Sequence, residues 1–397
     1  MNFRIPLSAP DITQAEIDAV SSVLRTPHLC FGPELAAFET ALASYCSVDH
    51  AVAVSSGTAG LHLALIALGI GEGDEVIVPS FAFVAVANTV RQVRAKPVFA
   101  EIDPLTLNLD PASVERAITS QTRAIVVVHT FGVPAQMDAF QTIARRCGLA
   151  LIEDACEAIG AEFDSHRVGS FGDMAVLGFY PNKQITTGEG GAVLCRDANH
   201  ALRLRSLRNQ GRSGEDWLDH EEPGFNYRLS DIACALGRVQ LARIDEILGL
   251  RAQVATRYDA LIKTISGLEL PLLQLARRKL SWFVYVVRLP ADVNREQVQA
   301  QMALEGIATG RYFGPLHQQP AHRGEPAPAS LRLAVTEQVA PRMLALPFFN
   351  RITHGEQEQV ADALRSAINR ARQSQSSAPQ ASMNKLVGNP EAPNLDD

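Results

Sequence analysis

The stretch HAVAVSSGTAGLHLALIALG, from His50 to Gly69, sets a pattern that the neighbouring sequence repeats. Four small apolar residues follow His50, as expected for a strand buried on both faces of a sheet. The turn SSGTAG comes next, and the run LHLALIALG after it is apolar enough to form an interior helix. The stretch therefore predicts one strand–turn–helix unit of an α/β protein.

Short apolar strands alternate with helical segments on both sides of this unit. Further strands are predicted at 74–79, 96–102, 123–130, 149–155 and 173–180. Helices are predicted at 14–24, 34–46, 111–118 and 135–148. Apolar strands separated by helices form parallel sheets that helices cover on both faces. We therefore expect an α/β fold built on such a sheet.

From about Leu229 the pattern changes to that of a second, smaller unit. A helical segment over 231–248 leads to a strand at 282–289, and a final helix is expected over 356–372. The residues after it are polar, aperiodic and rich in Ser and Pro, which is typical of disorder. We predict a large α/β domain over 1–245, a smaller α+β domain over 246–372 and a disordered tail over 373–397.

The composition argues against several classes of protein. A net charge of −7 over 397 residues, with no basic run, argues against a nucleic-acid binder. No apolar run approaches the roughly 20 residues that cross a bilayer, and MNFRIPLSAP at the start lacks the layout of a signal peptide. Six cysteines without a C-x-x-C pair indicate reduced thiols. We expect a cytoplasmic protein that has no metal site and binds neither nucleic acid nor membrane.

Two motifs follow predicted strands, where ligands bind in parallel sheets. The turn SSGT at 55–58 places glycine and hydroxyl residues before a helix, which suits a phosphate but also caps helices that bind nothing. Asp154 ends another strand, and a buried carboxylate needs a partner. That partner is a cationic ring nitrogen, a helix N-terminus or a structural ion pair.

A third motif, GFYPNKQITTGEGGAVL from Gly178 to Leu194, places Lys183 after a further strand. A lysine between a proline and a glycine-rich turn could be an ordinary surface charge. An amine partly withdrawn from water instead loses its proton more easily and attacks aldehydes. A phosphate site, a carboxylate and a lysine at strand ends of one sheet are together the groups that bind pyridoxal phosphate.

With these motifs in order, the sequence resembles the DegT/DnrJ/StrS family of nucleotide-sugar aminotransferases, fold-type I enzymes that depend on pyridoxal 5′-phosphate. The most specific motif is K-x-x-T-T-G-E-G-G after an aromatic strand end. FGPELAAFETALASYC, LIEDACEAIGA and FNYRLSDIACALGRVQL add order and spacing. The resemblance implies a large domain with a mostly parallel seven-stranded sheet between helices, and a smaller C-terminal α+β domain.

The resemblance also implies roles for single residues. Lys183 takes the place of the catalytic lysine that holds the cofactor as a Schiff base, and Asp154 that of the aspartate facing the pyridine nitrogen. Gly57 and Thr58 correspond to the residues that grip the phosphate, and Phe83 to the ring stacked on the cofactor.

Three further positions concern the cofactor. Asn226 corresponds to an asparagine that reaches the phosphate from the partner subunit, which implies a homodimer with shared active sites. Glu157 stands where the family often has a glutamine that contacts the ring hydroxyl, so Glu157 is protonated, turned away or tuning the ring differently. Gly178 stands where many members have a phosphate-binding serine. Phosphate binding should then depend more on Thr58, backbone amides and Asn226.

The implied function is transfer of an amino group from L-glutamate to a nucleotide-linked keto-deoxy sugar, at C4 rather than C3, in amino-sugar biosynthesis. Candidate substrate contacts, each with a structural role as its alternative, are Gln210–Arg212, Arg228, Tyr312 and His317. His129 is expected in the core. Two alternative functions are a pyridoxal-phosphate sugar dehydratase, whose family members carry histidine in place of Lys183, and a non-catalytic regulatory homologue.

Overall fold

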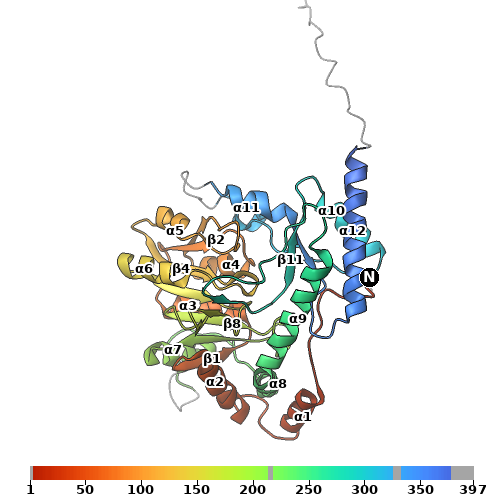
Figure 1. Ribbon diagram of the computed structural model, residues 1–397. Coiled ribbons are helices and arrows are strands. Elements are labelled where there is room, and N and C mark those ends of the chain that lie inside the picture. Colours follow the sequence, from red (N-terminus) through yellow and green to blue (C-terminus); the bar gives the residue numbers. More distant parts are fainter. Residues whose placement is uncertain (1–2, 213–217, 325–331, 377–397) are drawn as a thin grey trace, which may run out of the picture.

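The computed structural model of the chain describes residues 3–212, 218–324 and 332–376 (Figure 1). They form a seven-stranded sheet between helices, on the left of Figure 1, and a smaller group of helices and strands on the right. Residues 377–397, which make up most of the predicted tail, lie outside the described residues.

The central sheet consists of β1 (His50–Val54), β2 (Glu75–Pro79), β3 (Lys96–Ala100), β4 (Thr122–Val128), β5 (Ala150–Asp154), β8 (Met174–Gly178) and β9 (Gly191–Cys195). Their spatial order is β1-β9-β8-β5-β4-β2-β3. Neighbouring strands are parallel, except that β9 is antiparallel to both β1 and β8. The predicted α/β fold with a mostly parallel seven-stranded sheet is therefore confirmed, although β9 was not predicted from the residue pattern.

Helices cover both faces of this sheet because successive strand residues point to opposite sides. The helices are α2 (Pro33–Cys46), α3 (Gly57–Ala67), α4 (Ala85–Gln92), α5 (Pro111–Ala117), α6 (Met137–Cys147), α7 (Ala198–Arg208) and α8 (Asp231–Ala242). Val52 and Val54 pack on the side of α3, α4 and α7. Ala51 and Ala53 face the other side, which α2 and α8 cover near β1 and which α5 and α6 cover further along the sheet.

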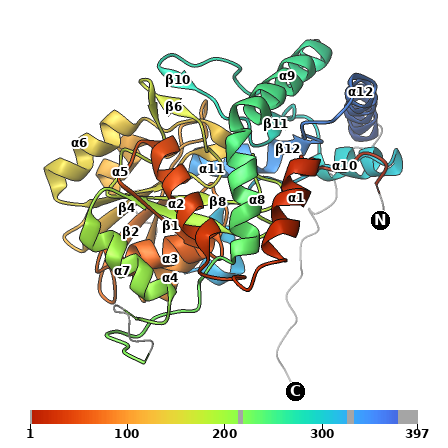
Figure 2. The ribbon, with the colours of Figure 1, turned by 90° about the horizontal axis from the view of Figure 1, so that it is seen from below.

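A second apolar core lies beside the sheet (Figure 2). It is built from α9 (Ile244–Ile262), β11 (Tyr285–Arg288), α10 (Arg295–Leu304), β12 (Met343–Leu346) and α12 (His354–Ser376). Tyr258 and Tyr285 are fully buried in it, and β11 pairs with β12 in an antiparallel ladder. Ile5 also packs here and forms a bridge with Ile307, so the predicted division at residue 245 does not describe the N-terminal segment.

Two predicted helices differ from the observed ones. The helix expected over 231–248 is divided into α8 and α9 at Arg243, whose guanidinium binds Glu16 and Glu246. The final helix reaches Ser376, so the predicted tail began too early at residue 373.

The other helices and strands are α1 (Gln14–Val23), β6 (Glu162–Phe163), β7 (His166–Arg167), β10 (Arg278–Lys279) and α11 (Ala334–Val339). Short 3-10 turns span Thr130–Gly132, Leu316–Gln318, Pro320–His322 and Ala340–Arg342.

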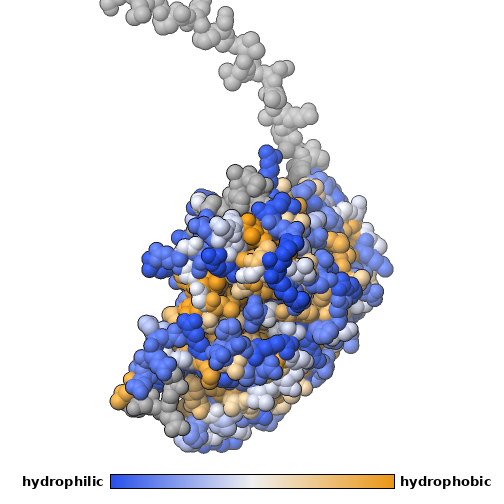
Figure 3. Space-filling model, turned by 90° about the vertical axis from the view of Figure 1, so that its left-hand side faces the viewer, coloured by the Kyte–Doolittle hydropathy of each residue, from blue (hydrophilic) through white to orange (hydrophobic). Residues whose placement is uncertain are grey.

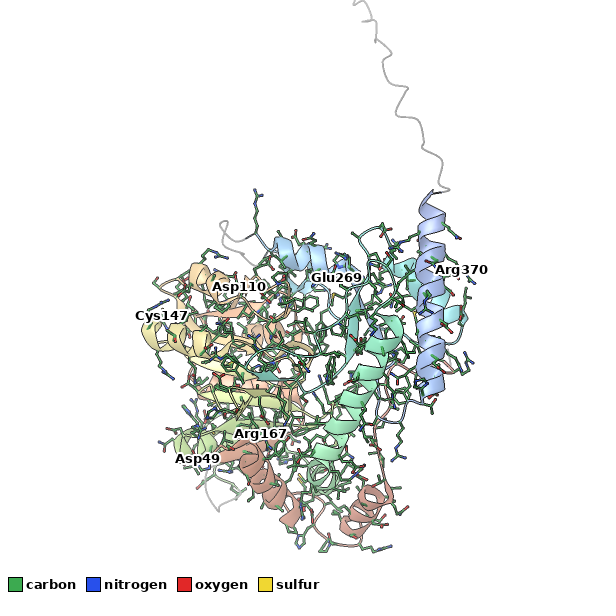
Figure 4. The ribbon with its side chains drawn as sticks, in the orientation of Figure 1. Asp49, Asp110, Cys147, Arg167, Glu269 and Arg370 are labelled. Atoms are coloured by element: carbon green, nitrogen blue, oxygen red, sulfur yellow. The ribbon has the colours of Figure 1, made fainter. Side chains whose placement is uncertain are left out.

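Carboxylates anchor several helix N-termini and thereby fix the chain around them. Asp110, labelled in Figure 4, caps α5 through the amides of Ala112 and Ser113. Buried Asp231 accepts hydrogen bonds from the amides of Gly32 and Glu34 at the start of α2. These acceptors satisfy helix amides that have no partner within the helix.

The cysteines form no disulfides, and the surface mixes apolar and hydrophilic residues. All six cysteines are free, and Cys147 lies at the outer edge of the sheet unit in Figure 4. On the face shown in Figure 3, apolar residues lie in patches between hydrophilic ones, which is ordinary for a protein surface. Within the described ranges, no helix combines the length and the apolar character needed to cross a bilayer.

Candidate active site

A cavity of about 500 Å³ lies where the carboxyl ends of β5 and β8 meet the N-terminus of α3. This is the edge of an α/β sheet at which ligands bind. Among the residues selected from the sequence, its wall contains Gly57, Thr58, Phe83, Asp154, Glu157, Gly178, Lys183 and Tyr312. The sheet topology therefore brings most of the predicted site residues together.

Asp154 is the last residue of β5 and lies in the wall of the cavity. It is buried, and its Oδ1 accepts a hydrogen bond from the amide of Cys156 at 3.1 Å. Among the described residues, no lysine, arginine or histidine forms an ion pair with it. A buried carboxylate without an ion-pair partner among the described residues is suited to a ligand that brings a positive charge.

Lys183 lies between an acid and an aromatic ring. Its Nζ is 3.6 Å from Oε1 of Glu157 and 4.0 Å from the centroid of the Phe283 ring. The side chain is only 15% exposed, so the amine belongs to the cavity and not to the surface. Burial raises the pKa of Glu157 above its ordinary value of 4.5, while Lys183 opposes this rise.

Glu157 is also held by the backbone. Its Oε2 accepts a hydrogen bond from the amide of Phe131 at 2.9 Å. The carboxyl group is therefore turned toward Lys183 on one side and toward the Thr130–Gly132 turn on the other. Glu157 lies in the cavity wall, and the three states expected for it, protonated, turned away or tuning the ring differently, stay predictions.

The N-terminus of α3 forms another part of the wall. Ser56 is the N-cap residue, and its Oγ accepts a hydrogen bond from the amide of Ala59. Gly57 and Thr58 are the first two residues of the helix and line the cavity. Because the first amides of a helix point outward without partners, they offer donors to an anion.

Aromatic side chains border the cavity. Phe83 is 59% exposed, and its ring centroid is 6.4 Å from that of Phe313. The hydroxyl of Tyr312 accepts a weak hydrogen bond from Nδ2 of Asn182 at 3.4 Å. The exposure of Phe83 leaves its ring free to stack on a flat ligand.

Several predicted residues do not line the cavity. Asn226 is exposed and forms a backbone bridge with Asn209, whose Oδ1 accepts a hydrogen bond from Arg228 at 3.1 Å. Gln210–Arg212 also lie outside the wall. The Nδ1 atom of His317 is 2.6 Å from Oγ of Ser80, and its Nε2 atom is 3.0 Å from Oε1 of Glu337. These hydrogen bonds hold the 310–324 segment against the residue that follows β2 and against α11.

His129 is a core residue, as predicted. It is fully buried, and its Nδ1 accepts a hydrogen bond from the amide of Ala135. Nε2 therefore carries the ring proton and donates a hydrogen bond to Oε2 of Glu153, 3.0 Å away. Glu153 points away from the cavity, although it precedes Asp154 on the same strand.

The wall also contains residues that were not selected from the sequence, among them Cys156, Asn182, Phe283 and Phe313. Cys156 and Asn182 lie within motifs that were quoted for their neighbours. Phe283 gave no such signal, because it comes from the segment before β11 and reaches Lys183 only through the packing of the two cores. Among the described residues, no group of three or more His, Cys, Asp or Glu side chains could hold a metal ion.

Comparison with known proteins defines the class: the protein is an aminotransferase. The model of the DegT/DnrJ/EryC1/StrS aminotransferase family matches residues 10–365, and the chain belongs to this family. GDP-perosamine synthase of Caulobacter vibrioides is 39% identical over 365 residues, which cover 91% of this chain and 97% of that protein.

Two further comparisons agree with this assignment. The dTDP-3-amino-3,4,6-trideoxy-α-D-glucose transaminase of Streptomyces venezuelae is 38% identical over 377 residues, covering 93% of this chain and 98% of that protein. The crystal structure of S. venezuelae DesV in complex with a ketimine intermediate has a TM-score of 0.84 and 37% identity. The match covers 91% of this chain and 98% of that chain.

Proposed function

We propose that the protein uses pyridoxal 5′-phosphate to move an amino group from L-glutamate to a keto group of a nucleotide-linked keto-deoxy sugar. The observation that carries the proposal is that Lys183, Asp154 and the N-terminus of α3 share one cavity. The two relatives named above are sugar-modifying enzymes, one a GDP-perosamine synthase and the other a dTDP-sugar transaminase. The product is an amino sugar for a glycan or a natural product.

The residues of the cavity fit this cofactor. Asp154 lacks a cationic partner among the described residues, and a protonated pyridine nitrogen would provide one. The amides at Gly57 and Thr58 suit the phosphate, and Phe83 offers an exposed ring face. A cavity of about 500 Å³ is large enough for the cofactor together with part of a substrate.

Each of these side chains has a separate task in the reaction. When bound, pyridoxal phosphate supplies an electron-withdrawing ring that stabilises negative charge on the donor's α-carbon. Asp154 would hold a proton at the ring nitrogen by its negative charge. Lys183 Nζ would accept the proton that leaves the α-carbon of glutamate and later deliver a proton to the sugar carbon that gains nitrogen. Phe283 and Glu157 hold the amine in place for this transfer.

The experiment that tests the function supplies glutamate and a panel of nucleotide-linked keto-sugars, with the keto group at C3 or C4. We expect an aminated product by mass spectrometry and 2-oxoglutarate in equal amount. The motif NKQITTGEGG resembles members that act at C4, so the C4 ketones should react faster. A sugar product that has lost water and gained no nitrogen would support the dehydratase instead. Absence of any product with cofactor bound would favour the regulatory homologue.

We also propose that the working unit is a homodimer with shared active sites. Both substrates are anions, yet the described residues of the cavity wall include Asp154, Glu157 and Glu189 and a single cation, Lys183. Further positive charge therefore has to come from outside this wall. The segment with Asn226 and Arg228 lies outside the cavity of its own chain, which is consistent with a contribution of these residues to the cavity of the partner subunit. Phe31, 48% exposed below the Arg228 guanidinium, marks the same surface as apolar.

Mixing two inactive variants tests the shared site. Lys183→Ala and Arg228→Ala should each lose activity, and dissociation and reassociation of the mixture should restore activity. A hybrid dimer then contains one complete cavity, so about a quarter of the wild-type activity is expected after random mixing. The measurement is the rate of amino-sugar formation before and after mixing.

The control pairs Lys183→Ala with Asp154→Asn. Both residues lie in the wall of the same cavity, so no hybrid of these two variants has a complete site. Equal recovery in the two mixtures, or recovery in neither, would contradict the proposed contribution of Arg228 across the dimer.

A further inference from the structure

One spot between α3 and β8 is shared by three residues of the cavity wall: Gly57, Cys156 and Gly178. Gly57 begins α3 and Gly178 ends β8, so the two glycines belong to different elements. Cys156 follows β5 and extends its side chain between them. We call these three residues the cradle.

In the cradle, a side chain added at either glycine would press on Cys156, which would have to shift. A Cβ atom added at Gly178 would lie 3.1 Å from Cβ and 3.2 Å from Sγ of Cys156. A Cβ atom added at Gly57 would lie 2.7 Å from the same Sγ. Neither glycine has a φ in the left-handed region, so a side chain at either position is opposed by contact with Cys156 and not by backbone conformation.

Cys156 also connects the cradle to the carboxylate of the site. Its amide donates to Oδ1 of Asp154 at 3.1 Å, and its Sγ lies 3.7 Å from the carbonyl oxygen of Val176 in β8. Burial, together with the charge of Asp154, raises the pKa of the Cys156 thiol well above its ordinary value of 9.0. The side chain is therefore a neutral spacer and adds no negative charge beside an anion site.

We propose that Cys156 is a positioning residue for the cofactor phosphate: its side chain spaces the N-terminus of α3 from the end of β8 and occupies the volume that a side chain at position 178 would fill. This inference rests on the proposed function. It explains why the cradle works with glycine at position 178, because the missing side chain is replaced in space by the thiol of Cys156.

The test is a double-mutant cycle that measures binding to cofactor-free protein, not activity. Gly178→Ala, Cys156→Ala and the double variant are titrated with pyridoxal 5′-phosphate and with pyridoxal, which lacks the phosphate. Gly178→Ala should weaken binding of the phosphate form about tenfold because the cradle is overpacked. The double variant loses the Sγ atom of Cys156 but keeps its Cβ atom, so it should regain part of the affinity that Gly178→Ala loses.

The ratio of the two dissociation constants reports on the phosphate end alone. Both ligands present the same aldehyde to Lys183. The dissociation constant of pyridoxal divided by that of pyridoxal 5′-phosphate should therefore fall in Gly178→Ala and rise again in the double variant. Cys234→Ala is the matched control, because Cys234 is buried in α8 away from the cavity and should leave the ratio unchanged. If Gly178→Ala does not fold, the double variant is compared with Cys156→Ala. The inference then predicts that the double variant folds and that the ratio of dissociation constants is similar in these two proteins.

The outcomes separate this inference from the function on which it rests. If the wild type binds neither ligand, the proposed function fails. If it binds both but the effects of the two substitutions simply add, the cradle inference fails and the function stands. The inference fails equally if pyridoxal and its phosphate are weakened by the same factor.

Discussion

Replacing Lys183 with alanine is expected to lower the rate of amino transfer by at least about 10³-fold, because the variant loses both the nucleophile and the proton carrier. No other lysine lies in the described wall of the cavity, so no neighbouring amine can take over. The rate is measured as amino-sugar formation under saturating glutamate. In the wild type, borohydride should fix the cofactor to the peptide that contains Lys183, and in the variant it should not.

Two controls separate chemistry from charge. Lys183→Arg keeps a positive group between Glu157 and Phe283 but cannot act as a nucleophile, so it should be as inactive as the alanine variant. Lys96→Ala removes a lysine that pairs with Glu75 at the opposite end of the strands, and it should leave the rate unchanged. Turnover of Lys183→Ala within tenfold of the wild type would refute the assignment.

The sheet could be predicted because its strands are short apolar runs that end in recognisable turns. A continuous apolar run identifies a buried strand such as the one ending at Asp154, and the shared edge of a parallel sheet then places strand-end motifs together. β9 was missed because its five residues follow directly on the glycine-rich part of the Lys183 motif, which looks like a loop. Its antiparallel direction depends on pairing with β1 and β8, which local pattern does not encode.

The parts of the site that were missed depend on contacts between distant segments. Phe283 approaches Lys183 because the segment before β11 is held by Arg251, whose guanidinium donates to the carbonyl oxygens of Trp282 and Phe283. Such a contact has no signature in sequence spacing. His317, in contrast, was selected for its residue type, and only the structure shows it engaged by Ser80 and Glu337.

Asp154 and Glu153 are adjacent in β5, and substituting each should give opposite results. Asp154→Asn is expected to lower the rate of amino transfer on the order of 10²-fold, since an opposite charge shifts the pKa of a neighbouring group by one to three units. Its stability should change little, because the asparagine oxygen can still accept the hydrogen bond from the Cys156 amide. The two measurements are the rate and the midpoint of thermal unfolding.

Glu153→Gln should lower the stability of the protein and leave the rate of amino transfer nearly unchanged. Its carboxylate is fully buried and accepts hydrogen bonds from the amides of Gly169, Phe171 and Gly172 and from His129 Nε2. An amide NH₂ cannot accept, so glutamine leaves some of these donors without a partner and should cost about 2–4 kcal/mol of stability. The rate per folded molecule should stay near that of the wild type, because the side chain faces away from the cavity. If Glu153→Gln proves as inactive as Asp154→Asn at a temperature where both are folded, the separate role of Asp154 at the ring nitrogen is lost. The charge of the strand end as a whole would then account for both effects.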